Sequence, residues 1–465
     1  MSIDYTEIML SNFGKSVLLT LSVSPVLLAA TQLKEVILHP LDTAVCDRTY
    51  QILASRGITL RVAGQRGNIK FEAFLASEPH ERRQAYSPEA LNYLNHQFIP
   101  ELDSILEKYP VAGVFPNTNM IFDFTPAPKI NSSFRNSPPD IIGSANVTIE
   151  SPTYGSPVFH ISPAETITVD QLRTINFHEL GHWMHYASAT QNGFPLAELK
   201  RNLEEAKDNL DKAIGPEAKK QRAEADVRYR LIRLATDRED ELFADVYSMA
   251  VTNSAKIGNA RDLSAMTFTD AFEQKMVVPP IGDPVIDYHS SMNSARSVIY
   301  RTFLENDWLR NTSEVSGQKQ LFLKKLSRIL AQQQKGQWEG AVEIMGKSNL
   351  SESNPLLGPG LMRSYQIQSG ALADLSVITK MIQEEMLSPK VSREMTQVLR
   401  KLAVVLDDFT PDRPLNPESY PDPLQRKLAT YLKGPGIIYR QGIAFQNLKT
   451  LAKEISHLPE PSKAN

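Results

Sequence analysis

Apolar runs typical of strands and of helices alternate over residues 1 to about 108, and from Val111 to Ser162 the pattern changes to short apolar runs separated by Pro, Asn and Ser. Such runs, rich in β-branched and aromatic residues, predict strands. We expect strands at Ser16–Val23, Thr59–Val62, Val111–Phe115, Met120–Phe124, Ala145–Glu150 and Val158–Ser162. Apolar residues at helical spacing predict helices among them, at Thr31–Val36, Thr43–Ser55 and Pro88–Lys108. Residues 1–110 therefore form a predicted mixed α/β region.

A helix is also predicted over residues 166–185. Thr168 and Gln171 have the spacing of a capping box, so the helix can begin there. Apolar residues continue at helical spacing, at Val169, Leu172, Ile175, Leu180 and Met184. The predicted strand at Val158–Ser162 lies just before this helix. As an edge strand it would offer main-chain groups to an extended peptide, and the same residues fit an interior strand equally well.

Helical patterns dominate the rest of the chain. Two charged helices at 195–213 and 216–235, on either side of Gly215, predict an inserted helical hairpin, and another helix follows at 236–251. Beyond Arg301 we expect helices at Gln318–Gln334, Gln337–Met345, Ala371–Met386, Val391–Asp407, Leu424–Leu432 and Gln446–His457. The pattern thus predicts three regions: 1–110, 111–300 with the hairpin at about 195–235, and a helical 301–465.

Composition narrows the class of protein. With 465 residues, 42% apolar and 22% charged, the chain has the make-up of an ordinary globular protein. Its net charge of −3 gives no reason to propose nucleic acid or an anionic membrane as a partner. The single cysteine, Cys46, excludes an intramolecular disulfide and fits a reducing compartment.

The apolar stretch Val17–Ala30 decides the expected location. It is too short to span a bilayer as a helix. It has the length of a signal-peptide core, but Asp4 and Glu7 precede it with only Lys15 as a cation. A buried strand running into a helix is the favoured interpretation. We therefore expect a cytoplasmic protein, with secretion as the alternative if this stretch is a signal segment or another export route is used.

The predicted helix at 166–185 contains His178-Glu179-Leu180-Gly181-His182, an H-E-x-x-H motif. Residues four apart lie on one face of a helix, so the two imidazoles point towards one place, as zinc ligands do. Glu179 can then take a proton from a metal-bound water. Gly181 costs about 1 kcal/mol of helix propensity against Ala, which suggests that another backbone or the substrate approaches there. The alternative is a helix with two unrelated histidines.

A catalytic zinc site needs a third protein ligand. The metzincin continuation fails, because His185 stands at its glycine position and Ser188 at its last histidine. His185 follows His182 by three residues and could approach the metal, but packing or a surface contact is the expected role. Glu241 and Asp245 lie four apart on a predicted helix that is otherwise apolar, where unpaired carboxylates are costly. Glu241 as ligand, with Asp245 accepting a ligand imidazole N–H, removes that cost. Glu239 and Asp240 remain alternative ligands, and a surface charge cluster is the non-functional interpretation.

The pair of motifs, H178-E179-x-x-H182 and E241-x-x-x-D245, resembles the gluzincin metallopeptidases, the clan that includes thermolysin and neprilysin. The resemblance covers these motifs and the strand before them. It implies an α+β fold with a zincin-like catalytic core at 111–300, made of a small mixed sheet and the active-site helix, and a C-terminal mainly helical domain. It also implies one Zn²⁺ per chain on His178, His182 and Glu241, with Glu179 as general base. The implied reaction is hydrolysis of a peptide or protein substrate.

A third element, Asp287-Tyr288-His289 followed by Arg296, looks like the D-x-H element found downstream in several gluzincin-like families. The tetrahedral intermediate of peptide hydrolysis carries negative charge that needs a hydrogen-bond donor. His289 or Arg296 could supply it, with Asp287 orienting the imidazole and Tyr288 as a competing donor. The alternative is the start of a helix with a surface histidine.

Two rival functions keep the same fold. One is a catalytically silent zincin-fold protein that binds partners or acts as a scaffold, against which the intact Glu179 argues. The other is a bacterial toxin or effector protease, which shares the chemistry and differs in the cell where it acts. The sequence does not specify the substrate.

Overall fold

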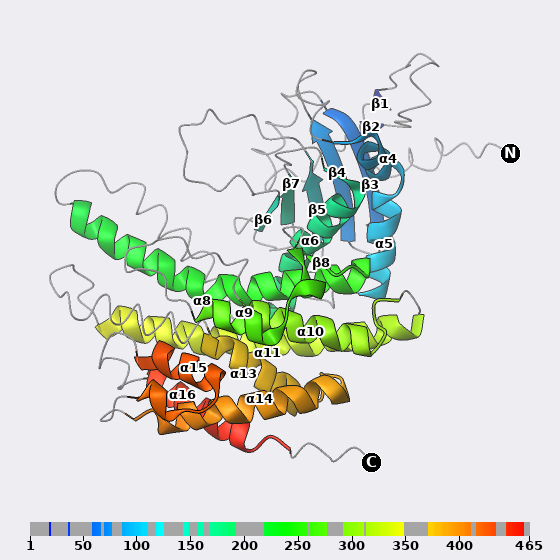
Figure 1. Cartoon of the computed structure of the whole chain (residues 1–465). Helices are drawn as coiled ribbons and strands as arrows, with labels where there is room; N and C mark the ends of the chain where they lie inside the picture. Colours follow the sequence, from blue (N-terminus) through cyan, green and yellow to red (C-terminus); the bar gives the residue numbers. More distant parts are fainter. Residues whose placement is uncertain are drawn as a thin grey trace. The chain divides into compact units, whose positions relative to one another are not determined.

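A computed structural model describes a large part of the chain. The described residues are 18–19, 36–37, 58–66, 69–76, 86–109, 118–124, 143–147, 157–161, 167–191, 218–257, 261–276, 292–310, 313–347, 371–410, 415–433 and 443–459. The fold is mainly helical with a small mixed sheet, in agreement with the α+β expectation (Figure 1).

The chain divides into two compact units, residues 1–179 and 180–465, and the division falls inside one helix. The region boundaries expected near 110 and 300 do not coincide with it. Strands from both sides of 110 pair in one sheet. At 300, helix α10 (Asn293–Glu305) packs on helices from both sides of it in the sequence. Long-range packing of this kind leaves no signal in a local hydrophobic pattern.

A five-stranded mixed sheet forms the centre of unit 1, in the order β3-β4-β5-β7-β6. The pairs β4–β5 and β5–β7 are parallel, whereas β3–β4 and β7–β6 are antiparallel. Because β7 lies between β5 and β6, it is an interior strand, and β6 ends the sheet among the described strands. The strands are β3 (Ile58–Arg66), β4 (Ile69–Ala76), β5 (Thr118–Asp123), β6 (Gly143–Val147) and β7 (Pro157–Ile161).

Most predicted strands agree with the described part of the sheet, namely those at 59–62, 120–124, 145–150 and 158–162. Two-residue strands β1 (Leu18–Leu19) and β2 (Val36–Ile37) also pair. The helix predicted over 31–36 is therefore wrong at Val36, a β-branched residue that suits a strand. The predicted elements at 43–55 and 111–115 lie outside the described residues.

The helix predicted over 88–108 is two helices, α4 (Pro88–His96) and α5 (Phe98–Lys108), which meet at Gln97. Pro100 explains the break, because its ring clashes with the carbonyl of the residue four before it and it has no N–H to donate. Phe98 then packs edge-on against Phe122, with ring centroids 4.9 Å apart. The break thus lets α5 bury an aromatic ring against the sheet.

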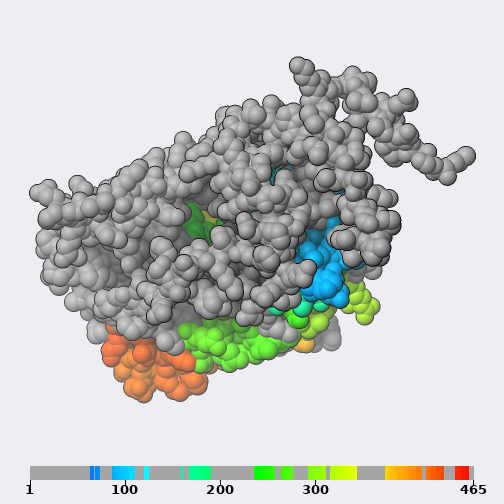
Figure 2. All heavy atoms as spheres, turned by 90° about the horizontal axis from the view of Figure 1, so that it is seen from above, coloured from blue at the N-terminus to red at the C-terminus, as the bar shows by residue number. Residues whose placement is uncertain are grey.

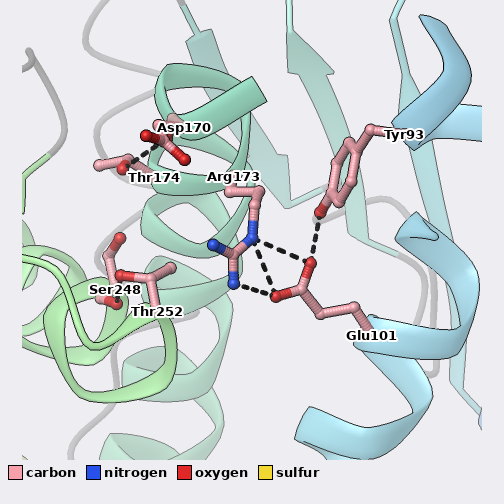
Figure 3. Close-up of polar contacts among 7 residues, drawn as sticks. All are labelled: Tyr93, Glu101, Asp170, Arg173, Thr174, Ser248 and Thr252. Carbon is pink, nitrogen blue, oxygen red and sulfur yellow. Dashed lines mark hydrogen bonds and ion pairs between the residues drawn. The ribbon is translucent and has the colours of Figure 1, made fainter. Parts of the chain in front are cut away.

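Helix α6 (Val169–Gln191) follows the sheet and begins with the expected capping box. Gln171 N donates to Thr168 Oγ1 at 3.3 Å, and Thr168 N donates to Gln171 Oε1 at 3.0 Å. Within unit 1, Arg173 Nε donates to Glu101 Oε1 at 3.0 Å, and Tyr93 donates to the same carboxylate at 2.8 Å (Figure 3). This carboxylate raises the pKa of Arg173, and burial raises the pKa of Tyr93 well above its ordinary value. The network ties α4, α5 and the start of α6 together.

Unit 2 is helical. Helix α8 (Ala218–Thr252) joins the predicted helices at 216–235 and 236–251, because residues 218–252 contain no Gly or Pro that would end a helix. The first arm of the predicted hairpin, 195–213, lies outside the described residues. Helix α11 (Ser313–Lys347) likewise merges two predicted helices and runs alongside α8 (Figure 1).

The remaining helices of unit 2 agree with the predicted ones to within a few residues. They are α13 (Ala371–Gln383), α14 (Pro389–Asp408), α15 (Pro423–Lys433) and α16 (Ile443–Ser456). Short elements are α9 (Phe268–Lys275), strands β8 (Lys256–Ile257) and β9 (Arg261–Asp262), and 3₁₀ turns at 263–265 and 417–419. At the surface the orange α15 lies beside the green α9, where Lys427 pairs with Glu273 (Figure 2). A search of the described helices for a bilayer-spanning segment finds none.

Candidate metal centre

Two helices bring three potential zinc ligands together. His178 and His182 lie on α6 and Glu241 lies on α8, and one ligand atom from each lies within 4.8 Å of the others. His182 Nε2 is 3.9 Å from Glu241 Oε1, and these two side chains are 11% and 14% exposed. The division between the units passes through α6, but both histidines belong to this one helix, whose geometry fixes their spacing. The cluster is thus nearly buried while retaining some access.

Gly181 explains how the two helices approach closely enough. A Cβ atom added at Gly181 would lie 2.6 Å from Ala244 Cα and 3.0 Å from Ala244 O. The helix backbones therefore touch at this point, one residue before His182 and three after Glu241. This is the close approach that the sequence predicts for the glycine.

Gly181→Ala should accordingly push α6 and α8 apart. We expect a loss of about 1–3 kcal/mol in the free energy of unfolding, the usual effect of overpacking, together with weaker zinc binding. Gly336→Ala is the matched control, because an added Cβ at this α11 glycine meets nothing within 4 Å. That change should stabilise the protein by about 0.5–1 kcal/mol. Denaturant unfolding of both variants measures the two effects; equal stabilities would contradict the close packing at Gly181.

The three consecutive acids Glu239, Asp240 and Glu241 have different surroundings, which separates the candidate ligands. Asp240 Oδ2 lies 3.1 Å from His182 Nδ1, the ring nitrogen that does not face Glu241. Glu239 is fully buried and accepts a hydrogen bond from Gln337 Nε2 at 2.7 Å. Carboxylates that hold the second nitrogen of a ligand histidine fix its tautomer and raise its basicity. Glu241 thus lies with the two histidines as a potential ligand, whereas Asp240 lies beside the other ring nitrogen of His182.

The residues present fit zinc. Two imidazole nitrogens and a carboxylate oxygen are a common catalytic donor set for this ion. Tetrahedral ligands at about 2.0–2.1 Å from zinc lie about 3.4 Å from one another. The separation of 3.9 Å between His182 Nε2 and Glu241 Oε1 is close to this spacing, and all three ligand atoms lie within 4.8 Å of one another.

Glu179, the predicted general base, is 4% exposed and follows His178 on α6. A carboxylate is costly to bury without a charge, hydrogen-bond or metal partner. Glu179 is buried directly after the first histidine of the pair, so a role at the exposed surface is excluded.

Asp245 lies one turn after Glu241 on α8 and contacts Arg296 of α10. Arg296 Nε donates to Asp245 Oδ2 at 2.6 Å, and the guanidinium is fully buried. Arg296 therefore pairs with the aspartate of the E-x-x-x-D motif. This contact does not support its predicted role as a hydrogen-bond donor to the tetrahedral intermediate. Hydrogen bonding of Asp245 to a ligand histidine stays a prediction. Asp287, Tyr288 and His289 lie outside the described residues.

His185, three residues after His182, is fully buried. Its ring nitrogens lie 3.2 Å from Ser327 Oγ and 3.0 Å from Gln334 Oε1, and its ring stacks on Phe243 with centroids 5.0 Å apart. The packing role predicted for His185 is confirmed, and the surface alternative is wrong. Sequence reasoning missed its partners on α11, because polar residues on a distant amphipathic helix give no signal of contact.

Comparison with known proteins identifies no relative: no protein-family model, no curated protein and no solved structure matches this chain.

Proposed function

We propose that this protein is a zinc metallopeptidase of gluzincin type that hydrolyses peptide bonds. The observation that supports it best is the convergence of His178, His182 and Glu241, with the buried Glu179 between the two histidines in the sequence. A chance pair of histidines on a helix would have no reason to meet a glutamate of another helix in a nearly buried place. A purely structural site would have no need of Glu179.

In this proposal the protein holds the metal and moves protons. A zinc ion bound by the three side chains would lower the pKa of a water molecule and polarise the substrate carbonyl. Glu179 takes the proton of the attacking water and then gives it to the leaving amine, as a general acid–base group. Asp240, whose Oδ2 lies 3.1 Å from His182 Nδ1, would favour the tautomer with its hydrogen on Nδ1, which leaves the Nε2 lone pair available as a metal ligand.

The sheet of unit 1 is compatible with a zincin-like core. It is small and mixed, and its interior strand β7 is the last strand before α6. In this proposal an extended peptide is added to the antiparallel strand β6 through main-chain hydrogen bonds.

Metal removal tests the proposed function. Treatment with a chelator should abolish hydrolysis of a denatured protein or a peptide mixture, and stoichiometric zinc should restore it. Zinc that binds only the folded state raises the free energy of unfolding, by about 2.7 kcal/mol when its free concentration is one hundred times the dissociation constant. Thermal unfolding with and without zinc therefore provides a readout that needs no substrate. Cleavage that survives complete metal removal would exclude the proposal, whereas zinc binding without cleavage of any peptide would favour a silent zincin-fold binding protein.

A further inference from the structure

Helix α11 carries three buried polar side chains that reach both metal-binding helices. Ser327, Gln334 and Gln337 are each at most 1% exposed. Ser327 and Gln334 contact His185 on α6, while Gln334 and Gln337 contact α8. All these contacts lie within unit 2. None belongs to the set of zinc ligands or to the proposed proton transfer.

The orientation of the Gln334 amide follows from its partners. Its Nε2 donates at 2.8 Å to the carbonyl oxygen of Thr236, which can only accept. Its Oε1 therefore faces His185 Nε2 at 3.0 Å, and that ring nitrogen must carry the hydrogen. In the neutral ring His185 Nδ1 then accepts from the Ser327 hydroxyl at 3.2 Å. One amide thus bridges α6 and α8, and both of its polar ends are used.

The bridge lies close to the metal ligands in the sequence. His185 follows His182 by three residues, so the two lie on neighbouring parts of one helix face. Thr236 precedes Glu241 by five residues, and Gln337 donates to Glu239 between them. Apolar packing alone would hold two helices together but tolerate small shifts, because it has no direction. Hydrogen bonds are directional, so a buried bridge whose two polar ends both have partners, as in Gln334, favours one register.

We propose that α11 is a positioning element of the metal centre, with Gln334 setting the register of α6 against α8 so that His182 meets Glu241. This inference rests on the proposed zinc site and extends it to a helix about 90 residues beyond Glu241 in the sequence. Gln334 touches no ligand and is a positioning residue. With this role, α11 makes the C-terminal helical region part of the metal centre, and that region is then not a separate appended domain.

A pair of identical substitutions at adjacent positions of α11 tests this role in the full-length protein. Gln334→Met removes the bridge. Gln333→Met is the control, because the Gln333 side chain accepts from Ser376 Oγ of α13 at 3.0 Å, a bond that involves neither metal-binding helix. Zinc affinity is measured by competition with a chromophoric chelator, and the denaturation midpoint of each metal-free variant is measured alongside. The visible spectrum of the cobalt(II)-substituted protein reports the geometry of the ligands.

We expect Gln334→Met to weaken zinc binding at least about tenfold, the lower end of the effect of residues that orient metal ligands, and to change the cobalt spectrum. Gln333→Met should leave both unchanged even if it lowers the denaturation midpoint. Should Gln334→Met not fold, Gln334→Asn, whose shorter amide cannot span both partners, replaces it. Wild-type affinity and spectrum in a folded Gln334 variant would overturn the positioning role, whereas a wild-type protein that binds no zinc would overturn the proposed function itself.

Discussion

Glu179→Gln is expected to retain zinc and to lose hydrolysis. The substitution keeps the size of the side chain and its helix propensity while removing the group that accepts and returns the proton. General acid–base groups accelerate reactions by about 10²–10⁴-fold, so the turnover number should fall by about 10²–10⁴-fold or more. Because none of the three ligands is changed, zinc content and thermal stability should stay at the wild-type level.

Asp170→Asn is the matched control for that experiment. It makes the same carboxylate-to-amide change in the first turn of the same helix, away from the ligands. It should leave turnover unchanged, which excludes a general effect of removing negative charge from α6. An unaltered turnover number in Glu179→Gln would remove this residue from the mechanism and favour a different base or a different reaction.

His178→Ala should empty the metal site. The zinc ion would lose one of three protein ligands, and the remaining His182 and Glu241 cannot complete a tetrahedral set with water at comparable affinity. Zinc measured by elemental analysis after dialysis should drop from about one per chain to near zero. Activity should disappear with the metal, and added zinc should no longer stabilise the fold.

His457→Ala controls for zinc bound loosely at the surface, because this histidine is exposed and follows α16. Its zinc content should equal that of the wild-type protein. Full zinc occupancy in both His178→Ala and His457→Ala would contradict the assigned site, because the metal would then have to lie elsewhere in the chain.

The parts of the account that could be predicted from the sequence are those that depend on neighbours in the chain. The capping box at Thr168 is a local pattern, and the i, i+4 histidines follow from helix geometry once that helix is expected. Glu241 could be proposed because a carboxylate on an apolar helix is costly unless it has a partner. The close approach at Gly181 could be predicted in the same way, because a glycine inside a helix lowers helix stability unless a side chain would not fit there.

The rest depends on contacts between distant segments. The sequence gives no sign that Gln334 bridges α6 and α8, because a buried glutamine on α11 looks like any polar residue of an amphipathic helix. The sequence leaves Asp240 open as an alternative ligand, and its position beside His182 Nδ1 distinguishes it from Glu241. The helix break at Gln97 does have a local signal in Pro100, but the apolar spacing continues across it and predicts one helix.

X-ray absorption at the zinc edge of the purified full-length protein tests the central claim most directly. The account predicts one zinc per chain, with two imidazole nitrogens, one carboxylate oxygen and a further light atom at about 2.0–2.1 Å. In His182→Ala, as in His178→Ala, zinc should be lost on dialysis, and the imidazole contribution should be lost with it. A spectrum with sulfur ligands, with no imidazole, or with wild-type imidazole scattering in His182→Ala would contradict a metal centre built from His178, His182 and Glu241.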